Sequence, residues 1–215
     1  KYSLDQSKVE TLIDDVKELL DQMIACNTAI AQEGMHGDYG ANIGKVIAIR
    51  KDLPSLLKAY AAAGSDARMN GCELPVVINS GSGNQGLTVS VPLIIYAERE
   101  HLDKEKLYRA LVISNLTAIH LKTEIGRLFA FCGAVSVGVA CGAGLAYLKD
   151  ASEEVMNHTI VNALAITSGI ICDGAKASCA AKIAVSVEAG ILGYDMYMNG
   201  QQFYGGDGII SKGIK

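Results

Sequence analysis

The first part of the chain repeats an apolar residue at alternating steps of three and four positions. The repeating positions are Val9, Leu12, Ile13, Val16, Leu19, Leu20, Met23 and Ile24. Such a repeat places one apolar stripe along a long amphipathic helix. Ser3 and Gln6 have the spacing of a capping box at its start, and Gly34 and Gly37 mark its end. The pattern therefore predicts a long helix that begins at Ser3.

Further helices are predicted from N-cap residues and apolar periodicity downstream. They are expected from Asp52 through Tyr60, from Leu87 to Tyr96 with a bend at Pro92, from Asp103 through Leu116, from Leu128 to Leu148, from Ser152 to about Ile171, and from Ala175 to about Leu192. Pro75–Ile78 is a short β-prone run, and the glycine-rich end of the chain is expected to be extended. There is no solenoid repeat and no alternation of strands with helices. We therefore predict an all-α fold in a single domain, residues 1–215.

The segment Leu128–Leu148 contains no charged residue and is long enough to cross a membrane. Its many glycine and alanine residues make it only weakly lipophilic, however. Gly138 and Gly142 are spaced so that another helix can approach the backbone closely. The segment is therefore predicted to be a buried, glycine-rich central helix of the bundle, without a membrane contact.

Composition narrows the classes of function. Half of the residues are hydrophobic and a fifth are charged, which disfavours disorder. The net charge of −4 argues against binding to nucleic acid or to an anionic membrane surface. The chain has six cysteines and shows neither an initiator Met nor an apolar signal segment at its start. We therefore interpret the cysteines as thiols or ligands rather than disulfides, and expect a cytoplasmic location.

The glycine-rich loop Ser80–Gly86 is the first candidate site. Gly81, Gly83 and Gly86 match the dinucleotide-binding fingerprint, but Pro92 interrupts the following helix and no second parallel strand is predicted. A nicotinamide oxidoreductase is therefore disfavoured. Backbone N–H groups of such a loop before a helix still form a nest for an anion, and a carboxylate has a suitable size. A tight turn with no ligand is the alternative.

Cys172 and Cys179 are the second candidate site. On a regular helix they would lie on one face about 10 Å apart, so a shared site requires the backbone to unwind, and Gly174 is where it would break. Cys132 would then lie alongside through a helical hairpin. Three thiolates without a fourth ligand suit an iron–sulfur cluster better than a structural zinc. Buried free thiols with no ligand remain the alternative.

Four stretches of sequence carry a resemblance to a known family. They are Asn79–Gly86, Cys132–Ala134, Val137–Cys141 and the run from Cys172 to Lys176 that continues to Cys179. With these stretches the chain resembles the L-cysteine desulfidase family, which is related to the alpha chain (catalytic domain) of iron–sulfur L-serine dehydratases. The short spacing between Cys172 and Cys179 resembles the desulfidase branch.

The resemblance implies a [4Fe–4S] cluster held by Cys132, Cys172 and Cys179. It also implies that the substrate carboxylate binds the loop formed by Ser80, Gly81, Ser82, Gly83, Asn84 and Gln85. The implied activity is α,β-elimination on L-cysteine, giving pyruvate, ammonia and sulfide without pyridoxal phosphate, with L-serine as the alternative substrate. Cys141 is interpreted as a packing residue. Family members are longer, so we expect this chain to be a C-terminal part whose partner is a preceding N-terminal segment.

The catalytic base is the least determined element. His120, His158 and Lys176 have suitable chemistry, and Lys122 is suited either to proton transfer or to orienting the carboxylate. The preceding segment is the other place for the base. Cys26 and Cys72 are interpreted as structural, and the glycine-rich helices are compatible with a homodimer. A non-catalytic helical module with structural thiols or zinc is the remaining reading.

Overall fold

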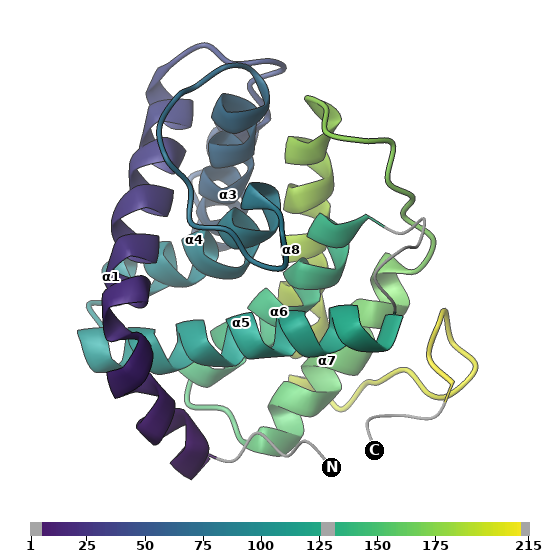
Figure 1. Cartoon of the computed structure of the whole chain (residues 1–215). Coiled ribbons are helices and arrows are strands. Elements are labelled where there is room, and N and C mark those ends of the chain that lie inside the picture. Colours follow the sequence, from purple (N-terminus) through teal and green to yellow (C-terminus); the bar gives the residue numbers. More distant parts are fainter. Residues whose placement is uncertain (1–5, 126–131, 212–215) are drawn as a thin grey trace.

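All regular structure in the described residues is helical. The computed structural model describes residues 6–125 and 132–211. The helices are α1 (Gln6–His36), α2 (Ile43–Ala48), α3 (Leu53–Met69), α4 (Gly83–Arg99), α5 (Lys104–Ile125), α6 (Gly133–Leu148), α7 (Glu153–Thr167) and α8 (Ser178–Met198) (Figure 1). The predicted all-α bundle is confirmed, whereas the assignment of residues 1–215 to one domain stays a prediction.

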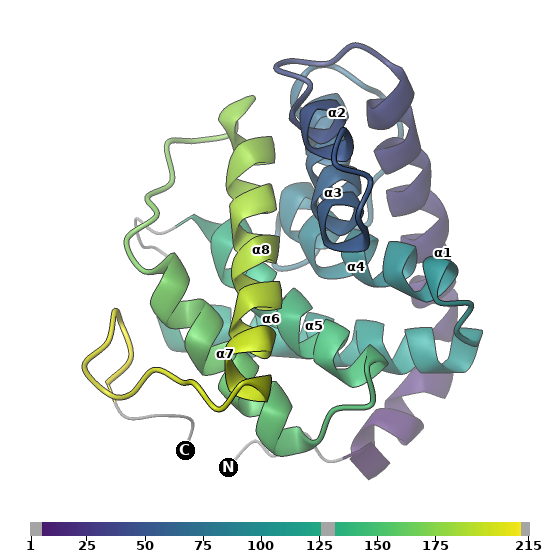
Figure 2. The ribbon, with the colours of Figure 1, turned by 180° about the vertical axis from the view of Figure 1, so that it is seen from behind.

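Helix α6 lies at the centre of the bundle. It packs against α4, α5, α7 and α8. Figure 1 shows α5 crossing one side of α6, and Figure 2 shows α8 crossing the other. Every residue of α6 except Gly133 and Tyr147 is buried, as expected for the glycine-rich central helix. None of the helices in the described parts of the chain combines the length and apolar character needed to span a bilayer.

Glycines set the close crossing of α6 and α8. A Cβ atom on Gly142 would lie 2.8 Å from Cα of Gly190, and one on Gly138 would lie 2.3 Å from Oγ of Ser186. Real Cβ atoms do not approach other atoms so closely, so only glycine permits this separation of the two backbones. The close approach predicted from the Gly138 and Gly142 spacing is confirmed.

Three predicted helix starts have side-chain capping bonds, and one of them is at Ser152, whose hydroxyl accepts from the Val155 N–H at 3.4 Å. The Asp52 carboxylate accepts from the Ser55 N–H at 2.9 Å, and the Asp103 carboxylate accepts from the Lys106 N–H at 2.8 Å. These bonds satisfy N–H groups that the first turn of a helix leaves unpaired. The capping box at Ser3, and the side chains of Val9, Leu12 and Ile13, lie outside the residues or side chains that the structure describes.

Several boundaries differ from the sequence prediction. Helix α1 ends at His36, so Gly37 marks its end as predicted, whereas Gly34 lies inside the last turn, where a Cβ atom would lie 2.0 Å from the Ala63 carbonyl oxygen of α3. The short helix α2 was not predicted. Helix α7 ends at Thr167 and α8 begins only at Ser178. Gly169 and Gly174, with φ of +92° and +93°, adopt the left-handed conformation in the intervening segment.

The β-prone run Pro75–Ile78 is not a strand, and the structure describes only an isolated bridge between Asn79 and Ser82 nearby. The Asn27 side chain bonds both backbone groups of Val77, accepting from its N–H at 2.9 Å and donating to its carbonyl at 3.2 Å. A buried amide thus takes the place of a neighbouring strand. Leu19, assigned to the apolar stripe, is 52% exposed and does not belong to the core.

Candidate active site at the start of helix α6

The three cysteines singled out by the sequence lie on segments that meet at the start of α6. Cys132 is the N-cap of α6, Cys179 is the second residue of α8, and Cys172 lies between α7 and α8. The Cys132 N–H donates to the Ile170 carbonyl at 3.0 Å, which fixes the start of α6 to the segment carrying Cys172. All three are free thiols, of which Cys132 and Cys179 are buried and Cys172 is exposed.

The pKa of the Cys132 thiol depends on its burial and on the other two cysteines. Burial raises the pKa of the Cys132 thiol, and the charges of Cys172 and Cys179 raise it further, while the amides of Ala134 and Val135 act in the opposite direction. The Cys179 thiol donates to the Gly174 carbonyl at 3.6 Å. The backbone unwinding at Gly174 that the sequence required is present, because residues 168–177 are not helical.

The described residues do not present the cysteines as ligands of a single metal ion. Within residues 6–125 and 132–211, no group of three His, Cys, Asp or Glu residues lies close enough to hold one metal ion. A structural zinc needs four ligands around one point and does not fit these cysteines. In a [4Fe–4S] cluster each thiolate binds a different iron atom, so the sulfur atoms surround a group larger than one metal ion. Positions at the starts of α6 and α8 also favour negative charge.

The glycine loop has a defined backbone conformation. Asn79 and Ser82 exchange two backbone hydrogen bonds, of 3.2 and 3.1 Å, and the chain turns between them through Ser80 and Gly81, whose φ values are +49° and +86°. The left-handed region is unfavourable for serine, and such strain is concentrated at functional sites. Helix α4 begins at Gly83, within the loop and earlier than the predicted Leu87, so the loop ends in the unpaired N–H groups of a helix start.

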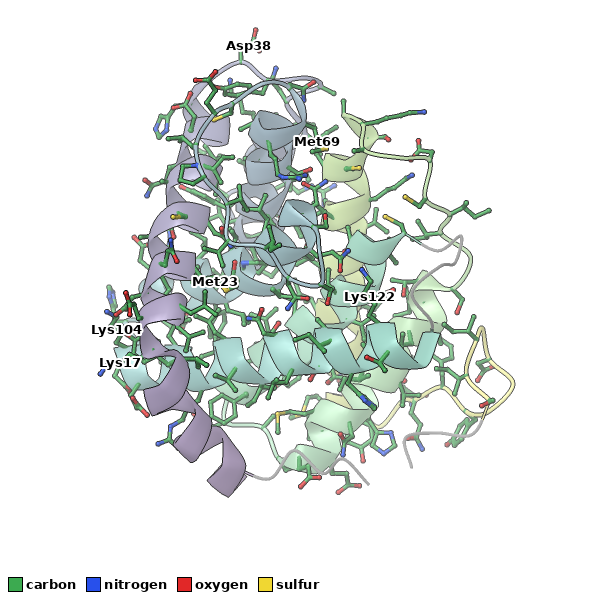
Figure 3. The ribbon with its side chains drawn as sticks, viewed as in Figure 1. Lys17, Met23, Asp38, Met69, Lys104 and Lys122 are labelled. Atoms are coloured by element: carbon green, nitrogen blue, oxygen red, sulfur yellow. The ribbon has the colours of Figure 1, made fainter. Side chains whose placement is uncertain are left out.

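Two cationic side chains hold this loop. The Lys122 ammonium donates to the Ser80 carbonyl at 2.7 Å, and Figure 3 shows Lys122 near the end of α5. The Arg68 guanidinium donates to the Asn84 side-chain oxygen at 3.3 Å, and a Cβ atom on Gly83 would lie 2.3 Å from Nε of Arg68. Both cations favour an anion at the loop. Sequence reasoning missed Arg68, because it lies outside every motif and reaches the loop only through the packing of α3 on α4.

Gln85 brings the loop to the cysteines. Its side-chain nitrogen lies 2.6 Å from the position that a Cβ atom would occupy on Gly133, the residue after Cys132. Gln85 is 6% exposed, and its Oε1 atom is buried with no hydrogen-bond partner among the described residues. A buried acceptor without a partner is costly, which indicates a place for a ligand's donor group.

The candidate bases lie in different places. His158 stacks on Tyr197 with 4.2 Å between ring centroids. Tyr197 is about 27 Å further along α8 than Cys179, so His158 lies far from the cysteines. His120 is exposed on α5, and Lys176 is exposed in the cysteine segment. Of these candidates, Lys122 is the one bonded to the glycine loop.

The remaining cysteines have other surroundings. Cys141 is wholly buried inside α6, and burial raises its pKa, in keeping with a packing role. Cys26 and Cys72 are half-buried on other elements.

Comparison with known proteins gives the family. The model of the serine dehydratase alpha chain matches residues 2–215. The chain belongs to the serine dehydratase alpha chain family. It is 62% identical over 205 residues to a UPF0597 protein of Desulfitobacterium hafniense, covering 94% of this chain and 48% of that protein. It is 44% identical to a UPF0597 protein of Fusobacterium nucleatum, covering 100% of this chain and 52% of that protein.

The chain thus spans about half the length of the curated relatives that it matches. No solved structure matches it. Family membership agrees with the resemblance to serine dehydratases drawn from the cysteine and glycine motifs. The finer assignment to the L-cysteine desulfidase branch stays a proposal.

Proposed function

We propose that this chain is the cluster-binding part of a lyase that carries out α,β-elimination on a small L-amino acid. L-Cysteine is the proposed substrate, and pyruvate, ammonia and sulfide are the products. The observation that carries the proposal is the contact between Gln85 and Gly133. It brings an anion-binding loop to the helix start where Cys132 lies, so one small substrate reaches both.

Cys132, Cys172 and Cys179 would hold a [4Fe–4S] cluster. When bound, the cluster would supply a Lewis-acidic iron that activates the leaving group of the substrate. The chain's own contribution is to supply three thiolates, and two of them, those of Cys132 and Cys179, lie at helix starts, where amide N–H groups stabilise negative charge. Because Cys132 and Cys179 are buried, water is excluded from part of this site.

The glycine loop would bind and orient the substrate. The loop from Ser80 to Gln85 takes the carboxylate through its backbone N–H groups other than that of Ser82, which is bonded to Asn79, as anions are bound at helix starts. Lys122 and Arg68 keep the loop in shape through Ser80 and Asn84. The unpaired Oε1 atom of Gln85 accepts from the substrate amino group, which satisfies the buried oxygen. These two contacts, to the carboxylate and to the amino group, orient Cα.

The elimination also requires a base for the Cα proton. His158 lies far from the loop, and His120 and Lys176 are exposed. Lys122 donates to Ser80, so we assign it to orienting the loop rather than to proton transfer. We place the base in the half of the enzyme that this sequence does not include, because the chain spans about half of its relatives.

L-Serine is the second candidate substrate. The family is named for serine dehydratase, and the same site would release water instead of sulfide. L-Cysteine is preferred because the seven-residue step from Cys172 to Cys179 resembles the desulfidase branch.

Anaerobic purification of the full-length protein tests the proposal. Iron and acid-labile sulfide are measured together with the absorbance spectrum, and sulfide release from L-cysteine is compared with pyruvate release from L-serine. Cys132→Ser is expected to lose iron and activity, whereas Cys72→Ser, outside the three ligands, is expected to keep both. Full activity in protein without iron would overturn the proposal. Faster turnover of L-serine than of L-cysteine would show that L-serine is the substrate.

A further inference from the structure

The segment that carries Cys172 is bonded to α8 by Lys182, Ser178 and Cys179, and Lys182 makes two of these bonds. The Lys182 ammonium pairs with the Asp173 carboxylate and donates to the Ile171 carbonyl at 3.1 Å. The Ser178 hydroxyl donates to the other Asp173 oxygen at 3.3 Å. Lys182 therefore bonds the residues on both sides of Cys172.

Packing does little to fix this segment. Residues 171–176 are all exposed, and Ile171 is 64% exposed. Gly174 has a φ of +93°, and a Cβ atom there would contact nothing within 4 Å. A segment with few buried contacts opens readily unless polar bonds hold it. The bonds from Lys182 and Ser178 are thus well placed to decide where Cys172 lies.

Lys182 also lies close to the two buried cysteines. It follows Cys179 by three residues, which puts both side chains on the same face of α8. The Asp173 carboxylate raises the pKa of Lys182, and the charges of Cys132 and Cys179 act in the same direction. The Lys182 ammonium group thus pairs with a carboxylate of the cysteine segment and lies on the helix face that carries Cys179.

We propose that Lys182 is a positioning residue of the cysteine site. It holds Cys172 beside Cys132 and Cys179 by bonding Ile171 and Asp173, and its positive charge offsets part of the negative charge that three thiolates bring together. The role toward a cluster rests on the proposed function. The role as a latch, meaning that Lys182 holds residues 171–173 against α8, does not rest on the proposed function, and it is testable in the chain without iron.

A second lysine ion pair that involves α8 provides a matched control. Lys58 of α3 pairs with Glu188 of α8, and the two lysine side chains have similar exposure, 13% for Lys58 and 22% for Lys182. Lys58→Met removes an ion pair of the same kind from α8 but leaves the cysteine segment untouched. Lys182→Met removes the latch, and Lys182→Arg keeps its charge and its ability to bond Asp173.

Limited trypsin digestion of the iron-free chain tests the latch, because Lys176 is exposed in the middle of the segment. Cleavage after Lys176, followed by mass spectrometry, is expected to be about ten-fold faster in Lys182→Met. Lys182→Arg and Lys58→Met are expected to be cleaved like the wild type. Equal rates in all four proteins would overturn the proposal.

Iron retention in the full-length protein tests the role toward the cluster. Iron per chain and the cluster absorbance are expected to fall several-fold in Lys182→Met, to recover in Lys182→Arg and to be unchanged in Lys58→Met. Iron retention that is the same in Lys182→Met and the wild type would overturn this role. A wild type without iron would instead overturn the proposed function, while the digestion would still decide whether Lys182 is a latch.

Discussion

The side-chain amide of Gln85 lies against Gly133, with its nitrogen 2.6 Å from where a Cβ atom would be. Gln85 belongs to the glycine loop, and Gly133 follows Cys132. This contact joins the two segments that the sequence marked separately as carrying chemistry. It also explains why the first residue of α6 is a glycine.

Gly133→Ala is expected to displace Gln85 and weaken substrate binding. The clash is with the end of a flexible side chain, so the loss of stability should be only about 1 kcal/mol. A rise in KM of about ten-fold, larger than the change in kcat, is expected in the full-length enzyme. In a Gln85→Ala background the same substitution should have little further effect on KM. Additive effects in the double variant would contradict the contact.

Lys122→Met removes the bond to the Ser80 carbonyl and should loosen the glycine loop. A hydrogen bond from a charged donor contributes roughly 1.5–3 kcal/mol, so KM is expected to rise about ten-fold or more. Lys106→Met is the matched control on α5, since Lys106 pairs with Asp150 at 2.7 Å away from the loop. Steady-state kinetics of both variants measure this. An unchanged KM in Lys122→Met would refute the assignment.

Gly142→Ala tests the crossing of α6 and α8. The new methyl group would meet the Gly190 backbone, which cannot move aside as a side chain can. Overpacking of this kind costs about 1–3 kcal/mol, or roughly 2–12 °C in Tm for a chain of this size. Val185→Ala, at a position of α8 that is 53% exposed, should change Tm little. Thermal unfolding followed by circular dichroism gives both values.

The Asp21 carboxylate should make stability depend on pH in the acid range. It pairs with Lys104, which is labelled in Figure 3, at 2.6 Å and accepts from Tyr108 at 2.5 Å. Lys104, and then Tyr108, hold its pKa below the ordinary 3.8. A carboxyl whose pKa is lowered by folding contributes stability above its unfolded pKa and loses it as pH falls through the folded value.

Asp21→Asn should therefore lower the free energy of unfolding at neutral pH. Its difference from the wild type should shrink as pH falls below about 4. Urea unfolding at about pH 7, pH 5 and pH 3.5 measures this difference. The exposed Glu73 provides a control, Glu73→Gln, for which little difference is expected. A difference for Asp21→Asn that stays constant over this range would show that the pairing does not act through ionisation.

The helices could be predicted well because their signals are local. Asp52 and Asp103 cap helices that their own neighbours form, and the run of small residues in α6 is buried as its composition indicated. The sequence predicted the local structure less well where contacts with a segment distant in the sequence decide it. Gly37 directly follows the end of α1 as expected, but Gly34 lies inside the last turn, where the Ala63 backbone leaves no room for a side chain. Val77 lies in a β-prone run, but Asn27 bonds its backbone instead of a strand.

The sequence by itself predicted the all-helical class, which the structure confirms, and it singled out the glycine loop and the three cysteines as candidate site residues. Each of these follows from residue types at fixed short spacings, or from motifs that resemble a family. Only the tertiary structure decided that Gln85 meets Gly133, that Arg68 and Lys122 hold the loop, and that Lys182 bonds both sides of Cys172. The physical reason is that three of these contacts join separate elements, and the fourth depends on how the segment before α8 folds back onto that helix. Such placements are set by the burial of apolar faces throughout the bundle rather than by any local pattern.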